Sequence, residues 1–432
     1  MKLFLKRQFG MVIFGIGLGL TMPIRVSAEV PAAPSVSVRL EDLLEEARQN
    51  NAEIRAARAE WQAAKKRIVQ AWALPDPMAG FDIMGEMSES RVGPEENRFM
   101  ISQKIPFPLK LWKKRSLAVA ASRAAEQRYL AIQRDILNEL RQAYYALYEA
   151  DASLEVIAEI QDLLKKFEGV AQARYSNRQG SQRDVAKSQA EVSLSLEQVY
   201  MLEQKRDALV ALMNYLLHRS PLEDLGKLEK PVIARMEKTL PELITLAVEN
   251  RQEIKSMEAM VEKSRHARAL ARMQWIPDLN AGFTYTWVGA GMTTDPEDGK
   301  DSWMFPLTIN VPLWQNRLIP AFQEAGAELE AAEAKLTHSQ HETYYEVREA
   351  YVRYTTASKI TALYESAVIP QANLALSSDQ AGYETGEGDF LNLLDSERIY
   401  LNAKLTYIKV YAEVLRSHAD IQKAVGLDLT ED

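Results

Sequence analysis

Few residues in this sequence could carry chemistry. It has no cysteine, which excludes disulfides, thiolate nucleophiles and Cys-ligated metal centres. His338 and His341 share a face of a predicted helix beside Glu342. This spacing offers no third ligand, so we interpret it as an ordinary helix surface and expect no metal site. The glycine-rich loop that binds nucleotide phosphates is missing as well. We therefore expect no cofactor and no enzymatic activity.

Methionine is the one other residue type with metal chemistry here. A thioether binds soft ions such as Cu(I) or Ag(I), but methionine is also common apolar filler. A copper role is therefore the minor of two interpretations. The residues concerned, all close to predicted strands, are Met78, Met84, Met87, Met100, Met292 and Met304.

Composition sets the broad class. The chain has 432 residues, a formal net charge of −8, a mean hydropathy of −0.26, 19 glycines and 17 prolines. The apolar content of 47% is that of a folded protein. The negative balance argues against a nucleic-acid partner, which usually requires a basic face.

The first 28 residues read as a signal peptide. Lys2, Lys6 and Arg7 precede an uncharged run, and a small-x-small pattern ends at Ala28. The apolar run is shorter than a membrane-spanning helix requires. We expect residues 1–28 to be removed and the mature chain to be exported.

The remainder contains two tandem copies of one unit. Residues 40–54 match residues 240–254 at an offset of 200, and later matches follow in the same order. Ordered matches at a nearly constant offset indicate a duplication. We place the first repeat at residues 29–235 and the second at residues 236–432.

Each repeat is dominated by very long helices. Long stretches are free of glycine and proline and rich in strong helix formers. Helices of this length exceed those of ordinary globular domains, and apolar residues at spacings of three and four predict coiled-coil packing. The stretches span residues 109–168, 181–220, 327–369 and 389–425.

Two strand pairs interrupt the helices. We predict strands at about residues 78–87, 98–105, 279–288 and 303–311. Alternating apolar and small or polar residues, over nine or ten positions, fit transmembrane β-strands. Trp287, Trp303 and Tyr285 lie toward the loop-side ends, where an interfacial aromatic girdle is expected. Two hairpins packed on a soluble core are the alternative.

Four strands cannot close a transmembrane barrel, because such barrels need at least eight and leave no edge in lipid. Several chains would have to share one barrel. The fold class we predict is therefore mainly α with a small β part, in an oligomer.

A tight turn joins the long helices in each repeat. Gly180 and Ser181 lie in the first turn, and Gly386, Gly388 and Asp389 in the second. Glycine ends the incoming helix, and Ser181 or Asp389 is placed to cap the outgoing one. These are the tips of two helical hairpins.

The sequence resembles the TolC-like outer-membrane efflux proteins over essentially all of residues 38–427. The resemblance rests on the duplication, the strand pairs and the tip stretches 174–189 and 383–395. Pro75-Asp76-Pro77 and Trp112-Lys113-Lys114-Arg115 further resemble the heavy-metal and cation efflux branch.

The resemblance implies a homotrimer. Three chains would form a 12-stranded barrel in the outer membrane, in contact with its lipid, and continue it as a helical tunnel across the periplasm. A periplasmic adaptor protein would meet the tips and connect them to an inner-membrane pump of the resistance-nodulation-division or ABC type. A periplasmic adaptor and a structural coiled-coil protein are the alternative functions.

The resemblance also assigns residues to the tips. Periplasmic entrance and gating roles fall on Asp395, Asp184, Tyr383, Asp389 and Arg174. Contacts with the adaptor fall on Gly180, Ser181, Gly386, Glu387 and Gly388. Because symmetry repeats Asp389 and Asp395 in every subunit, we expect a carboxylate ring that favours cations. Metal and drug export both remain open.

Overall fold

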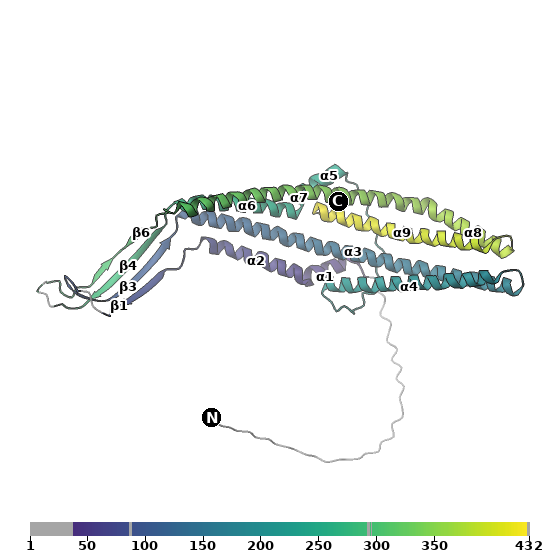
Figure 1. Ribbon diagram of the computed structural model, residues 1–432, viewed down its shortest axis with the longest axis horizontal. Coiled ribbons are helices and arrows are strands. Elements are labelled where there is room, and N and C mark those ends of the chain that lie inside the picture. Colours follow the sequence, from purple (N-terminus) through teal and green to yellow (C-terminus); the bar gives the residue numbers. More distant parts are fainter. Residues whose placement is uncertain (1–37, 86–88, 292–293, 295, 430–432) are drawn as a thin grey trace, which may run out of the picture. The chain divides into compact units, whose positions relative to one another are not determined.

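The computed structural model describes residues 38–85, 89–291, 294 and 296–429, all within a unit that spans Ser37–Asp432. The predicted signal peptide lies outside the described residues. The same order of elements occurs twice along the chain (Figure 1). The first series of helices is α1 (Leu40–Asn50), α2 (Ala52–Trp72), α3 (Pro108–Ser176) and α4 (Gln182–Leu217). The second is α5 (Leu240–Asn250), α6 (Gln252–Arg272), α7 (Gln315–Leu363), α8 (Ile369–Thr385) and α9 (Phe390–Val425).

The long helices extend beyond their predicted ends. Helix α3 has 69 residues, or roughly 100 Å at 1.5 Å per residue, and it continues through Gly169. Helices α7 and α8 are joined without a break by a π-helical turn, Tyr364–Val368. Pro370 follows this turn and has no N–H to donate, so the wider turn accommodates it. Proline therefore modifies the helix here instead of ending it.

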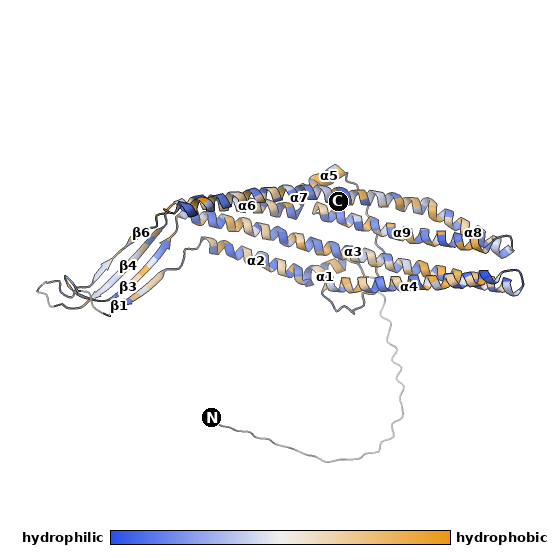
Figure 2. Ribbon diagram, viewed as in Figure 1, coloured by the Kyte–Doolittle hydropathy of each residue, from blue (hydrophilic) through white to orange (hydrophobic). Residues whose placement is uncertain are grey.

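The helices bury their apolar stripes against one another. Helix α3 packs on α2, α4, α6 and α9, and α7 packs on α6 and α9. Hydrophobic and hydrophilic residues are interspersed along each helix (Figure 2), as expected for helices that bury one apolar stripe. In α4, Val199 and Leu202 pack against the core, but Leu194 is 50% exposed in the single chain.

Lys110 joins the helices to the sheet. Its buried ammonium donates to Asp278 Oδ1 at 2.7 Å and to the carbonyl of Ile276 at 2.6 Å. The backbone N–H of Phe107 donates to the same carboxylate oxygen at 3.1 Å. Burial alone raises the pKa of Asp278, but the hydrogen bonds from Lys110 and Phe107 outweigh it and leave that pKa lowered. The start of α3 is thus fixed to the start of a strand.

The sheet differs from prediction mainly in strand length. Its principal strands are β1 (Met78–Ile83), β3 (Gly93–Ile105), β4 (Leu279–Val288), β5 (Ser302–Met304) and β6 (Leu307–Ile309), and the short β2 (Glu89–Ser90) pairs with β3. β1 is shorter than predicted and β3 longer. The last predicted strand is divided in two at Pro306, which cannot donate a ladder hydrogen bond.

The antiparallel order β1-β3-β4-β5, with β6 beside β4, sorts side chains into two faces. One row across the sheet joins Phe81, Phe99, Tyr285 and Trp303, and its neighbours are also largely apolar. The opposite face carries small and polar residues, such as Ser102 opposite Gly282. Within the described residues, no helix is long and apolar enough to cross a membrane.

Candidate functional site at the helical tips

The first tip joins α3 to α4. Arg178 adopts a left-handed conformation with φ 60°. A Cβ on Gly180 would lie 3.1 Å from Cβ of Arg174, so the turn is closely packed. Ser181 caps α4 as predicted: its hydroxyl accepts from the N–H of Asp184 at 3.3 Å, and its own N–H donates to the Asp184 carboxylate at 3.3 Å. This reciprocal capping box occupies the side chain of Asp184.

The second tip joins α8 to α9. Gly386 ends α8 with φ +91°, and the N–H groups of Gly386, Glu387 and Gly388 all donate to the carbonyl of Gly382. A Cβ on Gly388 would lie 2.8 Å from the backbone nitrogen of Tyr383, closer than real contacts allow. Asp389 occupies the N-cap position of α9 but makes no capping hydrogen bond, so its predicted capping role is wrong.

Arg174 and Tyr383 connect the two tips. The Arg174 guanidinium lies over the Tyr383 ring, 4.7 Å from its centroid, and donates to the Tyr383 carbonyl. Tyr383 is buried, with its ring 5.1 Å from that of Phe390. Burial raises the pKa of Tyr383; the charge of Asp184 raises it further, Arg174 lowers it and Asp389 raises it. Four of the five predicted entrance residues therefore belong to one neighbourhood.

Asp395, the fifth predicted entrance residue, lies apart from this contact. Its side chain is exposed, as is that of Asp389. Neither carboxylate has an ion-pair partner within the described part of the chain. The charge of Asp395 acts on Arg398, one turn further along α9. Both acids are therefore free to meet solvent or a solute.

Sequence reasoning missed a buried acid beside the second tip. Glu397 is 1% exposed, and its Oε1 has no hydrogen-bond partner among the described residues. The neighbouring Arg398 pairs with Glu191 of α4. A cavity of about 350 Å³ between these helices is lined by all three residues. The sequence did contain a signal for this buried acid. Glu397 occupies a position in the apolar stripe formed by Leu393, Leu394 and Leu401.

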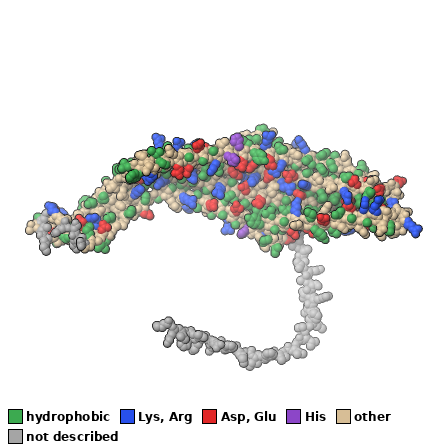
Figure 3. Space-filling view, in the orientation of Figure 1, with side chains coloured by type: hydrophobic (Ala, Val, Ile, Leu, Met, Phe, Trp, Pro, Cys, Tyr) green, Lys and Arg blue, Asp and Glu red, His purple; other side chains and the backbone are tan. Residues whose placement is uncertain are grey.

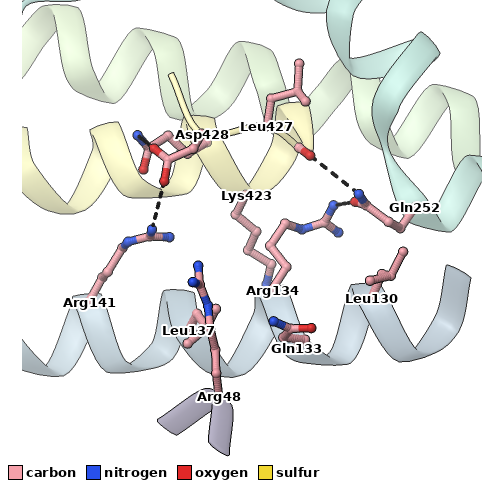
Figure 4. Close-up of a pocket in the computed structure, with 12 residues that line it drawn as sticks. Arg48, Leu130, Gln133, Arg134, Leu137, Arg141, Gln252, Lys423, Leu427 and Asp428 are labelled. Carbon is pink, nitrogen blue, oxygen red and sulfur yellow. Dashed lines mark hydrogen bonds and ion pairs between the residues drawn. The ribbon is translucent and has the colours of Figure 1, made fainter. Parts of the chain in front are cut away.

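A second cavity, of about 210 Å³, lies where the end of α9 meets α3 and α6. Figure 4 shows Arg134 reaching Gln252, and Arg141 reaching Asp428 at 3.5 Å. Arg134 also binds Glu253 through two hydrogen bonds of 2.6 and 2.7 Å. These arginines already have partners, so their contacts hold the surrounding helices together. The cavity therefore has little capacity to bind an anion.

The remaining metal hypotheses concern histidine and methionine. The described residues contain no group of three or more His, Asp or Glu placed to hold a metal ion. The His341 ring packs edge-on against Tyr344, with centroids 5.8 Å apart. Met100 and Met304 lie on the polar sheet face on either side of Thr284, whereas Met87 and Met292 lie outside the described residues.

The predicted girdle residues gather at one end of the sheet. The Trp287 ring lies 5.0 Å from that of Tyr285 and 5.8 Å from that of Phe81. Trp303 is 65% exposed and packs on Phe305 at 5.4 Å.

An amphipathic sheet continued by helical hairpins with glycine-bounded tips defines a membrane channel with a helical extension. The sequence model of the family described as "Outer membrane efflux protein" matches residues 43–216 and 243–427. The chain belongs to this family.

Individual relatives agree with this assignment. The chain is 23% identical over 409 residues to the cobalt-zinc-cadmium resistance protein CzcC of Cupriavidus metallidurans, covering 92% of each chain. Its fold resembles the outer-membrane channel OprN (TM-score 0.78, 18% identity, 90% of each chain). It also resembles the outer membrane protein VceC of Vibrio cholerae (TM-score 0.75, 18% identity, 90% of this chain and 96% of that one).

The protein is therefore an outer-membrane exit channel of a tripartite efflux system. It acts as a homotrimer with a periplasmic adaptor and an inner-membrane pump. The sheets of its subunits form the barrel in the outer membrane, and the long helices form the tunnel in the periplasm. The predicted fold class, location and partners are confirmed, and the family is one of channels, not of enzymes.

Proposed function

We propose that this channel exports divalent transition-metal cations, and that the second tip forms the cation-attracting part of its entrance. The observation that carries the proposal is the pair of exposed carboxylates, Asp389 and Asp395, on the α8–α9 hairpin. The named role of CzcC in cobalt, zinc and cadmium resistance supports the same cargo.

Symmetry multiplies the effect of these acids. A homotrimer presents each of them three times, and a ring of carboxylates at a narrow passage raises the local concentration of cations. Salt screens exposed charges beyond about 8 Å at physiological ionic strength, so the ring acts only on ions close to the entrance. Substrate choice by the pump remains the larger source of specificity.

The roles of the other tip residues are part of this proposal. Arg174 and Tyr383 hold the two hairpins together, and Asp184 holds the start of α4. The surfaces around Gly180 and Ser181, and around Gly386, Glu387 and Gly388, receive the adaptor. The girdle at the loop side of the barrel consists of Trp287, Trp303 and Tyr285. The boundary between the two repeats lies between residues 235 and 236.

Metal retention in cells tests the cargo. A strain carrying the cognate pump and adaptor is loaded with radioactive zinc or cobalt, with and without the channel. We expect loss of the channel to raise retained metal as much as loss of the pump does, with resistance to organic drugs unchanged. Drug sensitivity with normal metal retention would contradict the metal assignment and favour drug export.

The tip acids are tested in the same strain. The variant Asp389→Asn/Asp395→Asn should retain more metal than wild type at equal trimer abundance. Glu328→Gln/Glu330→Gln, which neutralises two exposed acids of α7, is the matched control and should behave as wild type. Equal retention by the two double variants would refute a special role for the tip acids.

A further inference from the structure

Tryptophan is concentrated where helices and strands meet. Four of the seven tryptophans lie in the helix ends that adjoin the sheet: Trp72 before β1, Trp112 after β3, Trp275 before β4 and Trp314 after β6. Trp112 is 63% exposed and Trp314 is 72% exposed. Trp287 and Trp303 lie at the opposite ends of the strands. The sheet is thus flanked by tryptophan at both ends, as membrane-spanning sheets are.

Three of these four helix ends are strongly basic, and none of the four contains an acid. Residues 61–75, 107–125, 263–277 and 311–323 hold three, five, four and one Lys or Arg residues in turn, and no Asp or Glu. The whole chain, by contrast, has a net charge of −8. Elsewhere on the helices, side chains of both signs are interspersed (Figure 3). Four acid-free helix ends beside the sheet of an acidic protein are therefore a distinct feature.

Some of these basic groups already have partners. Lys110 is buried against Asp278, and Arg123 pairs with Glu262 at 3.1 Å. Lys113, Lys114 and Arg115, by contrast, have no acidic partner within the described residues, and Lys114 and Arg115 are exposed. On the first turns of α3, Arg115 lies on the same face as the exposed Trp112, three residues away, and Lys113 and Lys114 lie on other faces of the same turn. An exposed indole beside unneutralised cations suits a surface that is apolar on one side and anionic on the other.

We propose that these helix ends form a collar that binds the headgroups of anionic phospholipids in the periplasmic leaflet of the outer membrane. The collar comprises Trp72, Trp112, Lys113, Lys114, Arg115 and Trp314. It directly adjoins the strands that enter the bilayer, so it lies at the level of the headgroups. Tryptophan prefers that level, and basic groups near it attract anionic lipid. The collar fixes the depth at which the barrel sits.

Lipid selectivity tests the collar. The full mature trimer is reconstituted in dioleoyl-phosphatidylglycerol or dioleoyl-phosphatidylcholine, each with a brominated-tail form, and quenching of tryptophan fluorescence measures relative lipid binding. We expect wild type to prefer phosphatidylglycerol at least fivefold at low salt, since even one basic group near the surface contributes about fivefold. The variant Lys113→Gln/Lys114→Gln/Arg115→Gln should lose this preference.

A matched control uses Lys335→Gln/Arg348→Gln/Lys359→Gln, three exposed basic residues of α7 away from the sheet; it should keep the wild-type preference. Salt gives a test without any variant, because the preference of wild type should fall in 0.5 M salt, where the Debye length is roughly 4 Å. An unchanged preference in the collar variant would overturn the proposal, as would a wild-type preference that salt does not reduce. Loss of the trimer with lipid preference intact would assign these residues to subunit contacts instead.

Discussion

Replacing Glu397 by glutamine should stabilise the second hairpin increasingly as the pH rises from 4.5 to 7, with the full effect above pH 7. Glu397 lies on the apolar stripe of α9 and is 1% exposed. Its pKa is raised from the ordinary 4.5 to about 7, chiefly by burial and also by the charge of Glu191, against the opposing charge of Arg398. The native structure therefore holds a proton on Glu397 more tightly than the unfolded chain does.

The magnitude follows from this pKa difference. A tenfold change in proton affinity corresponds to about 1.36 kcal/mol, so a rise from 4.5 to about 7 costs the native state roughly 3 kcal/mol once the carboxyl is ionised. The sign is fixed by proton linkage. The native state binds more protons than the unfolded state between pH 4.5 and 7, so its stability falls across this interval and then levels off.

Hydrogen exchange in the α9 segment 390–401, with thermal unfolding of the trimer, provides the assay. Glu397→Gln should slow exchange and raise the melting temperature at pH 8, because the amide carries no charge into the buried site. At pH 4.5 the difference from wild type should nearly vanish. Glu387→Gln, at the exposed tip, is the control and should change neither measurement. An equal effect at both pH values, or none at pH 8, would refute the reasoning.

Three further predictions concern tip and junction contacts. Arg174→Gln removes the guanidinium from the Tyr383 ring and should weaken the contact between the hairpins by about 1–2 kcal/mol. The open probability of the channel in planar bilayers should therefore rise. Arg178→Gln is the control and should leave the open probability unchanged. Gly388→Ala places a Cβ 2.8 Å from the Tyr383 nitrogen and should lower the melting temperature by several degrees. Gly326→Ala is the control, because a Cβ there would lie in open space within α7. It should leave the melting temperature unchanged or slightly raised. Lys110→Met removes the buried ion-pair partner of Asp278 and should cost about 3 kcal/mol or more, seen as loss of heat-resistant trimer on gels. Lys104→Met removes the longer, exposed pair to the same acid, at 3.8 Å, and should cost less than about 1 kcal/mol.

Local periodicity accounts for most of what could be predicted. The spacing of apolar residues within a segment indicates whether it forms a helix or a strand. The long helices and the strand pairs could therefore be predicted from the sequence. Proline was the main source of local error. The alternation of residue types predicts one continuous strand, but Pro306 divides it in two. Pro370 is accommodated by a π-helical turn, which no sequence pattern predicted.

Contacts across the fold were out of reach for a physical reason. Arg174 and Tyr383 are 209 residues apart, and no spacing rule places one over the other. Resemblance to a family selected both residues, but only the structure shows that they touch. Asp389 shows the reverse case, because the right residue at an N-cap position makes no capping hydrogen bond. Glu397 was detectable as a charge within an apolar stripe, whereas its proximity to the like charge of Glu191 on α4 was not.

We propose that solutes enter this channel through a tip that favours cations. The most direct test is the reversal potential of the purified trimer in a planar bilayer under a KCl gradient. We expect a reversal potential of the sign that marks K⁺ as the more permeant ion, and a value closer to zero in Asp389→Asn/Asp395→Asn. A Cl⁻-selective channel, or a cation preference unchanged in that variant, would contradict it.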